Sequence, residues 1–192
     1  RWRLADRSLI ENPPVVAHRT IEQIRVTLDI LESIMGRKDD FLNNNWIVRA
    51  RQVLKRVEQS IAKELRSDIS SRLEGVYVIV DPEVTRGRPV LEVAKAVLDG
   101  GATVVQLRDK INHMEKVREL ACKLKSMCLE YNALFIVNDD PGVAFLSRAD
   151  GLHLGQMDTP PHEARRLLKP CQILGVSNNS MDEISYSISQ DV

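Results

Sequence analysis

The stretch VYVIV at Val76–Val80 opens a run of short apolar segments, and this run decides the fold. The segments that follow are TVVQL, ALFIV, GLHL and QILGV, at Thr103–Leu107, Ala133–Val137, Gly151–Leu154 and Gln172–Val176. Amphipathic helical patterns lie between them. Strands that are apolar on both faces and alternate with helices are typical of a parallel sheet covered by helices. We therefore expect an α/β fold from residue 75 onward.

Two architectures have this alternation, the open doubly wound sheet and the (β/α)8 barrel. Nucleotide-binding doubly wound sheets carry Gly-x-Gly-x-x-Gly after the first strand, where this chain has Asp81-Pro82-Glu83. The sequence also has no Gly-x-x-x-x-Gly-Lys phosphate loop. Both observations disfavour a nucleotide-binding sheet.

The first 72 residues read as a helical hairpin, because apolar residues recur there at steps of three and four. One apolar stripe consists of Ile21, Ile24, Leu28, Leu31 and Met35, and a second of Trp46, Ala50, Val53, Val57, Ile61 and Leu65. A two-helix hairpin cannot bury both stripes alone. We expect this region (1–72) to dock on the following domain (75–192) or to pair with another copy, forming a homo-oligomer.

Composition and charge indicate which partners and which location to expect. The chain has 192 residues, and its 27 basic and 27 acidic residues give no net charge, which argues against a general nucleic-acid partner. Its apolar runs are far shorter than the roughly 20 residues that span a bilayer, so we expect no membrane partner. The chain opens without a basic-then-apolar leader, and its three cysteines form no Cys-x-x-Cys pair. We therefore expect a cytoplasmic location.

Polar side chains follow four of the expected strands. Because parallel strands bring their carboxyl ends to one rim, these side chains should lie close together. They are Gln106, Arg108 and Lys110 after the second strand, Asn138 and Asp139 after the third, Asp158 after the fourth and Ser177 after the fifth.

The residue types at this rim indicate a site for a phosphorylated ligand. Arg108 and Lys110 alternate with Asp109 and can grip phosphate oxygens from one side of an extended segment. Asp139 and Asp158 follow neighbouring strands, and two adjacent carboxylates repel each other unless they share a proton or a cation. A magnesium ion held by both acids and by ligand phosphate is the simplest interpretation. Neutral donors and acceptors that could hold a polar ring or phosphate are Gln106, Asn138 and Ser177.

Each residue also has a purely structural alternative. Arg108 and Asp109 could form a surface ion pair. Asp158 could cap the helix that begins near residue 160, and Asp140 could cap the one at residue 141. His153 lies inside a strand and could simply pack in the barrel wall.

Five sequence motifs together resemble one family. They are YVIVDPE from Tyr77, VVQLRDK at Val104–Lys110, FIVNDD at Phe135–Asp140, ADGLHLGQMD at Ala149–Asp158 and ILGVS at Ile173–Ser177. In this order they resemble the thiamine-phosphate synthase family, also called thiamine-phosphate pyrophosphorylase. The resemblance implies a (β/α)8 TIM barrel and a Mg²⁺-dependent transferase of thiamine biosynthesis. Such an enzyme couples hydroxymethylpyrimidine pyrophosphate with hydroxyethylthiazole phosphate to give thiamine phosphate and pyrophosphate.

The resemblance also implies roles for the rim residues. It makes Asp139 and Asp158 the Mg²⁺ ligands, and Ser177 a contact of the pyrophosphate or pyrimidine. Arg108 and Lys110 would be catalytic, since they stabilise the charge that grows on the leaving pyrophosphate. The residues that would hold the pyrimidine pyrophosphate are Gln106, Arg108, Lys110 and Asn138. No protein nucleophile is needed, and the sequence presents no convincing Ser–His or Cys–His arrangement.

Two features depart from the family. The 118 residues from Gly75 to Val192 hold about five of the eight βα units of a barrel, so we expect a fragment of a longer protein with little activity alone. Asn178 stands where the family often has histidine after the serine. Two alternatives remain. One is a thiazole tautomerase of the same superfamily, and the other is a non-catalytic assembly or regulatory module with a degenerate barrel.

Overall fold

The computed structural model describes residues 20, 23–31, 33 and 44–190. By its internal contacts the chain divides into two compact units, Arg1–Leu65 and Arg66–Val192, whereas the sequence suggested a division at residues 72–75. Helix α2 (Asn44–Ser70) contributes to both units. None of the helices in the described ranges combines the length and the hydropathy needed to cross a bilayer.

The first unit contains the helical residues 23–31 and most of α2, as far as Leu65. Leu28 of the first predicted stripe is buried, whereas Ile21 and Met35 lie outside the described residues. The buried residues of α2 are Ile47 and Ala62, each one position from a residue of the predicted stripe. Trp46, Val53 and Val57 of that stripe are 45%, 57% and 44% exposed. Half of the second predicted stripe is therefore exposed, and its other three residues, Ala50, Ile61 and Leu65, are half-buried.

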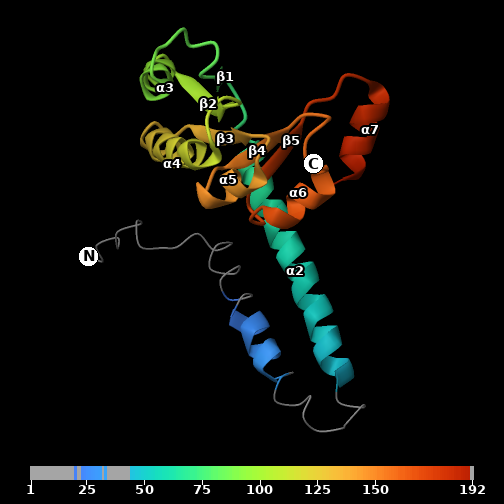
Figure 1. Cartoon of the computed structure of the whole chain (residues 1–192). Coiled ribbons are helices and arrows are strands. Elements are labelled where there is room, and N and C mark those ends of the chain that lie inside the picture. The colour runs from blue at the N-terminus through green and yellow to red at the C-terminus, as the bar shows by residue number, and fades with distance from the viewer. Residues whose placement is uncertain (1–19, 21–22, 32, 34–43, 191–192) are drawn as a thin grey trace, which may run out of the picture. The chain divides into compact units, whose positions relative to one another are not determined.

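Five parallel strands form the sheet of the second unit, in the spatial order β1-β2-β3-β4-β5 (Figure 1). They are β1 (Val76–Val80), β2 (Ala102–Leu107), β3 (Leu134–Asn138), β4 (Gly151–Leu154) and β5 (Ile173–Val176). Each strand pairs with the next one in the sequence, without the reversal of order that defines a doubly wound sheet. This order is that of a barrel wall, and it confirms the predicted α/β barrel class.

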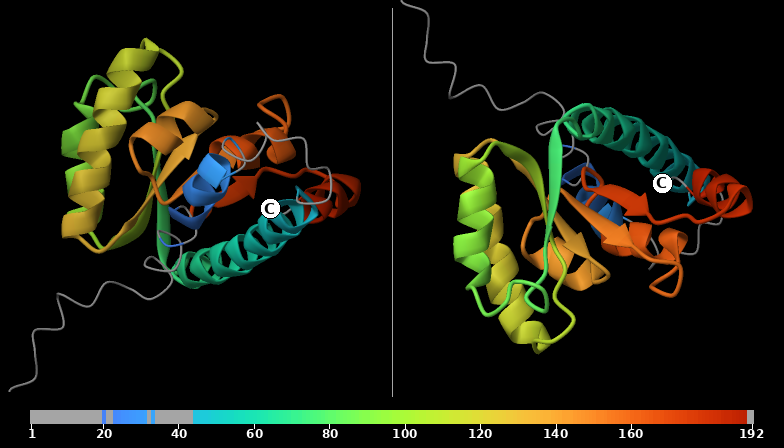
Figure 2. Two further views of the ribbon diagram at one scale, coloured as in Figure 1. Left: turned by 90° about the horizontal axis from the view of Figure 1, so that it is seen from below. Right: turned by 90° about the horizontal axis from the view of Figure 1, so that it is seen from above.

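Helices cover the outer face of the sheet (Figures 1 and 2). They are α3 (Val90–Asp99), α4 (Met114–Glu130), α5 (Pro141–Leu146) and α6 (Pro161–Leu167). A further helix, α7 (Met181–Ser189), follows β5. Alternate strand residues face α3–α6 and form the main core, for example Val105, Phe135 and Leu152. The strands β2 and β3 are largely buried on both faces, so their sequences read as continuously apolar rather than alternating, whereas three of the five residues of β1 are exposed.

The opposite, inner face holds a second apolar cluster near the amino ends of the strands. Val104, Leu134, Ile136 and Ile173 are buried there, and Ile69 from the last turn of α2 packs against them. Gly151 lies on the same face, where a Cβ atom would come within 2.4 Å of the Ile173 side chain and 2.8 Å of its carbonyl oxygen. Only glycine fits at that position. Toward the carboxyl ends the inner face becomes polar.

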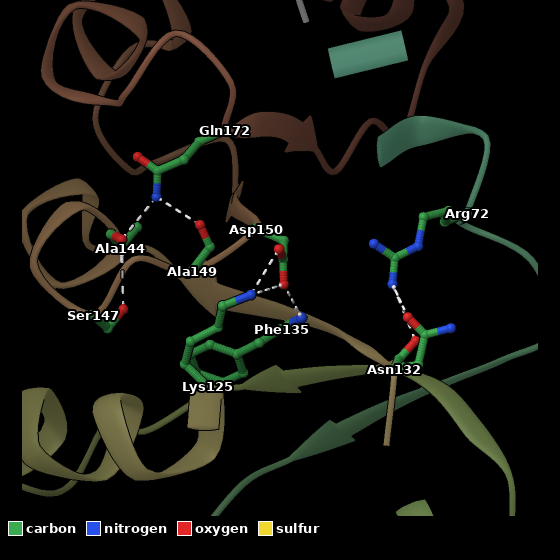
Figure 3. A network of polar contacts seen from close by, with 9 residues as sticks. All are labelled: Arg72, Lys125, Asn132, Phe135, Ala144, Ser147, Ala149, Asp150 and Gln172. Atoms are coloured by element: carbon green, nitrogen blue, oxygen red, sulfur yellow. Dashed lines mark hydrogen bonds and ion pairs between the residues drawn. The ribbon is translucent and has the colours of Figure 1, made fainter. Parts of the chain in front are cut away.

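Polar contacts hold the amino-terminal ends of the strands together (Figure 3). Lys125 of α4 donates to both carboxylate oxygens of Asp150, at 2.8 and 2.7 Å, and Asp150 also accepts from the N–H of Phe135 at 2.8 Å. Gln172 donates to two main-chain carbonyls, at 2.8 and 2.9 Å. Arg72 binds Asn132 at 3.1 Å. The sequence did not single out these residues.

Helix caps were predicted with mixed success. Asp140 caps α5 and Ser180 caps α7, each accepting from the N–H three residues onward, at 2.8 and 3.2 Å. Asn112 does not cap α4, because His113 occupies the cap position, without a side-chain hydrogen bond. The Asn112 amide donates instead to Asp109 at 2.7 Å, within the preceding loop.

Candidate functional site

Strand pairing continues beyond the strand ends and carries the predicted residues to one rim. The N–H groups of Arg108, Asp139 and Ser177 donate to carbonyls of the neighbouring strand at 2.8–3.0 Å. The first residues after β2, β3 and β5 are therefore held in register at the carboxyl ends of the strands. Parallel barrels place their functional groups at this end.

A tight turn at Asp139 aims its carboxylate. The N–H of Asp140 donates to the carbonyl of Asn138 at 2.9 Å, and Asp139 between them has φ +68°. A two-residue hydrogen bond around a positive φ is the signature of the rare, strained γ-turn. Strain of this kind costs about 1–3 kcal/mol and collects at functional sites.

The two acids meet at the rim, as predicted. Burial raises the pKa of Asp139, and its hydrogen bond with Asp158 raises that pKa further. Lys110 opposes this shift, with its Nζ 3.3 Å from a carboxylate oxygen of Asp139. Burial alone would raise the pKa of Asp158 too, but hydrogen bonds from Asp139 and from the Gly155 N–H outweigh it, so this pKa is lowered. The two ionised carboxylates therefore disfavour each other, and a shared proton or a cation between them would relieve this repulsion.

Asp158 does not cap the next helix. The residue before α6 is Pro160, and no side chain caps that helix end. Asp158 instead accepts from the Gly155 N–H at 2.6 Å, within its own loop. That bond orients the carboxylate toward the rim.

Arg108 pairs with a buried acid that the sequence analysis did not select. Its guanidinium donates to Asp81, which is 5% exposed and also accepts from the Glu83 N–H at 2.9 Å. The predicted alternative of an Arg108–Asp109 surface pair is wrong, because Asp109 accepts main-chain N–H groups in its own loop at 3.0 and 3.2 Å. Asp81 follows β1 directly, so its position at a strand end was the available signal.

A hydrogen-bonded chain of neutral groups crosses the inner face from β1 to β3. Tyr77 donates to Oε1 of Gln106 at 2.7 Å, and Nε2 of Gln106 donates to Oδ1 of Asn138 at 2.6 Å. Burial raises the pKa of Tyr77 to about 12, so the phenol keeps its proton. Gln106 and Asn138 were predicted, whereas Tyr77 was missed.

A serine and a histidine meet on β4 and β5. Nε2 of His153 lies 2.8 Å from Oγ of Ser177. Burial lowers the pKa of His153, while Asp139 and Asp158 oppose that shift. The neutral imidazole can therefore accept the serine proton. The sequence offered no such pair, because 24 residues separate the two and only strand pairing joins them. His153 is a rim residue rather than a packed wall residue.

The donor set at the rim fits a hard divalent cation. Two carboxylates face each other, and Mg²⁺ is usually held by one or two carboxylates, with water and ligand phosphate completing its shell. Soft or borderline metals would want cysteine or several histidines. Among the described residues, no group of three or more His, Cys, Asp and Glu side chains gathers to hold a metal. The described residues therefore suit Mg²⁺ held by two carboxylates, rather than a metal held by three or more protein side chains.

Comparison with known proteins identifies relatives of the sheet unit. A family model described as thiamine monophosphate synthase matches residues 76–191. The thiamine-phosphate synthase of Moorella thermoacetica is 43% identical over 108 residues, which are 56% of this chain and 51% of that protein. The one from Nostoc sp. is 39% identical over 119 residues, 62% of this chain and 33% of that protein.

A solved structure supports the same relationship. The thiamine phosphate pyrophosphorylase of Pyrococcus furiosus superposes with a TM-score of 0.57 and 34% identity, over 62% of this chain and 56% of that one. The chain spans about half the length of several curated relatives that it matches. The family match extends over more than half of the chain, from β1 to α7, so this chain belongs to the thiamine monophosphate synthase family.

Proposed function

We propose that the protein to which this chain belongs is a thiamine-phosphate synthase. It couples hydroxymethylpyrimidine pyrophosphate with hydroxyethylthiazole phosphate and releases pyrophosphate. The observation that carries the proposal is the meeting of Lys110 with the acid pair Asp139 and Asp158 at one rim, beside Arg108. Cations and acids so arranged suit a substrate that carries both phosphate and a divalent cation.

In this proposal the pyrimidine pyrophosphate lies across the ends of β2 and β3. Gln106 and Asn138 bind its polar ring, Arg108 and Lys110 bind its phosphates, and Ser177 reaches it from β5. Asp81 orients the guanidinium of Arg108, since the two side chains form a partly buried ion pair. A bound guanidinium that is already oriented loses less conformational entropy when it binds phosphate.

The reaction exchanges one bond at the pyrimidine methylene carbon. The bond from this carbon to the pyrophosphate oxygen breaks, and a bond to the thiazole nitrogen forms. Negative charge grows on the leaving pyrophosphate, where Arg108 and Lys110 stabilise it electrostatically. The electron-rich aminopyrimidine spreads the positive charge left on the carbon. Ser177 serves as a ligand contact in this scheme, with its hydroxyl oriented by His153, rather than as a nucleophile.

Asp139 and Asp158 would hold the magnesium ion. Mg²⁺ bound there supplies positive charge next to the phosphate oxygens. The raised pKa of Asp139 supports this assignment, because a cation between the acids would remove the repulsion that their ionised forms experience.

The two alternatives predict different behaviour. A thiazole tautomerase would not need the grip of Arg108 and Lys110 or the acid pair, so the presence of these groups favours the synthase. A non-catalytic module would bind no pyrimidine pyrophosphate. We further propose a cytoplasmic protein that acts on small molecules, with homo-oligomers formed through the exposed residues Trp46, Val53 and Val57 of α2.

Calorimetric titration tests the proposal on the 192-residue chain. We expect the chain to bind pyrimidine pyrophosphate in the presence of Mg²⁺, and Asp139→Asn to weaken this binding by about tenfold or more, because one of two carboxylate ligands is lost. Asp99→Asn is the matched control, since Asp99 pairs with Lys95 at the end of α3, outside the rim. Formation of thiamine phosphate from both substrates then tests the coupling. Equal affinities for the wild type and Asp139→Asn would contradict the metal assignment.

A further inference from the structure

Tyr77 takes no direct part in the proposed reaction, yet it begins the hydrogen-bonded chain on the inner face. Its hydroxyl is 2.7 Å from Oε1 of Gln106, and the other end of that amide is 2.6 Å from Oδ1 of Asn138. Residues 77 and 106 come from adjacent strands, and residue 138 ends the next one. The chain therefore links β1 to the rim.

The order of donors and acceptors along this series of hydrogen bonds matters, because a carboxamide has one accepting end and one donating end. When the phenol donates to Oε1 of Gln106, only Nε2 is left to serve Asn138. Nε2 is a donor, so Asn138 must meet it with its oxygen. The remaining group of Asn138 is then its NH2, which makes no hydrogen bond to another described residue. The direction of the chain thus decides what the rim offers to a ligand.

The environment of Gln106 supports the direction that the structure shows. Gln106 is 3% exposed, so both ends of its amide need protein partners, and Tyr77 and Asn138 are those partners. If both amides were rotated, Tyr77 would accept from Nε2 of Gln106, its own proton would be left to solvent because this side chain is 44% exposed, and the NH2 of Asn138 would donate to Gln106. Burial raises the pKa of Tyr77 to about 12, so the phenol keeps its proton at neutral pH and can donate to Oε1.

We propose that Tyr77 is a positioning residue that acts through Gln106 to fix the Asn138 amide with its NH2 group available to the ligand. The site at the end of β3 then selects a hydrogen-bond acceptor, either a ring nitrogen or a phosphate oxygen. The identity of the ligand rests on the proposed function, whereas the orientation of the two amides does not.

Nuclear magnetic resonance of the side-chain amides tests the orientation directly. In the wild-type chain we expect the NH2 of Gln106 to exchange slowly with solvent and the NH2 of Asn138 to exchange quickly. Tyr77→Phe removes only the hydroxyl and should accelerate exchange at Gln106 by about fivefold or more, the effect of losing one hydrogen bond. Tyr131→Phe is the matched control, because its hydroxyl contacts Lys95 and Asp99 outside the site.

Ligand binding gives a second measurement on the same variants. With Mg²⁺ present, we expect Tyr77→Phe to bind pyrimidine pyrophosphate about fivefold more weakly than the wild type and Tyr131→Phe to bind it equally well. Binding of inorganic pyrophosphate distinguishes a phosphate oxygen from a ring nitrogen as the acceptor. If Tyr77→Phe also binds inorganic pyrophosphate more weakly, Asn138 contacts a phosphate oxygen. If that affinity is unchanged, Asn138 contacts the pyrimidine ring.

Two results would overturn the inference. One is slow exchange of the Asn138 NH2 in the wild type, which means the reverse direction, in which this NH2 donates to Gln106, and which needs no variant to detect. The other is unchanged Gln106 exchange in a folded Tyr77→Phe chain. A wild-type chain that does not bind pyrimidine pyrophosphate would instead overturn the proposed function. The amide exchange measurement would still decide the role of Tyr77.

Discussion

The contact between Lys125 and Asp150 supports a quantitative prediction about stability. Their side chains are 13% and 16% exposed, and Asp150 also accepts the N–H of Phe135 on β3. Asp150→Ala leaves a buried ammonium and a main-chain N–H without their partner. We expect it to lower the free energy of unfolding of the sheet unit by about 3–5 kcal/mol.

Milder variants separate charge from hydrogen bonding. Asp150→Asn keeps an acceptor for Phe135 but leaves Lys125 charged and unmatched, and we expect a loss of about 2 kcal/mol. Lys125→Met leaves the carboxylate unmatched, with a loss of similar size. The double variant removes both charges and keeps the acceptor, so it should lose only about 1 kcal/mol, less than either single variant.

The assay must report on the sheet unit. Both tryptophans, Trp2 and Trp46, belong to the first unit, so tryptophan fluorescence would not follow it. Hydrogen exchange of peptides from β3 and β4, measured during urea unfolding, reports on the sheet unit. The control pair, Lys95→Met and Asp99→Asn, lies on an exposed helix surface and should leave the transition unchanged. Losses that simply add in the Lys125–Asp150 double variant would refute the view that the two charges compensate each other.

Three further predictions concern the rim and the core. Asp81→Asn should weaken pyrophosphate binding in the presence of Mg²⁺ by about tenfold, as measured by calorimetry, because Arg108 loses its charged partner. At pH 8, iodoacetamide should label exposed Cys122 and spare Cys128, whose pKa burial raises to about 11. The folded state then keeps the Cys128 proton that the unfolded state releases, so this thiol should reduce stability as pH rises from about 9 to 11. Without divalent cations at pH 7, Asp139→Asn should stabilise the sheet unit by about 1 kcal/mol in urea unfolding, because a carboxylate repulsion is removed. That gain should shrink as pH falls through the raised pKa of Asp139, since the folded wild type then binds a proton more tightly than the unfolded chain.

The sheet and its rim could be predicted from sequence for a simple physical reason. Short apolar runs that alternate with amphipathic helical patterns are typical of the strands of a parallel sheet, so Val76–Val80 and Gly151–Leu154 were found with their observed bounds. The carboxyl ends of parallel strands converge, so Asp139 and Asp158 could be expected together although they are far apart in the chain.

Partner choice at the rim could not be predicted in the same way. Arg108 has an acid next to it in sequence, yet it pairs with Asp81 on the adjacent strand, because the nearer carboxylate satisfies loop N–H groups. Strand register decides such pairings, and a single sequence does not state the register. The same reason explains why Tyr77 and His153 were undervalued.

The helical region shows a different limit. Apolar spacing revealed the stripe in α2, but the buried residues Ile47 and Ala62 each lie one position beyond it. An ion pair between helices, Arg51 with Asp29 at 2.6 Å, lies one turn from Ile47. Periodicity alone shows which residues are apolar, but it does not show which of them another segment covers.

The left-handed backbone at Asp139 has a consequence for variant libraries. A screen that selects only for folded chains should accept glycine or asparagine at position 139 and reject valine, isoleucine and threonine, whose branched Cβ atoms clash at φ +68°. A screen that selects for turnover should accept aspartate and reject glycine. The two amino-acid profiles at this position would then separate what the backbone demands from what the chemistry demands.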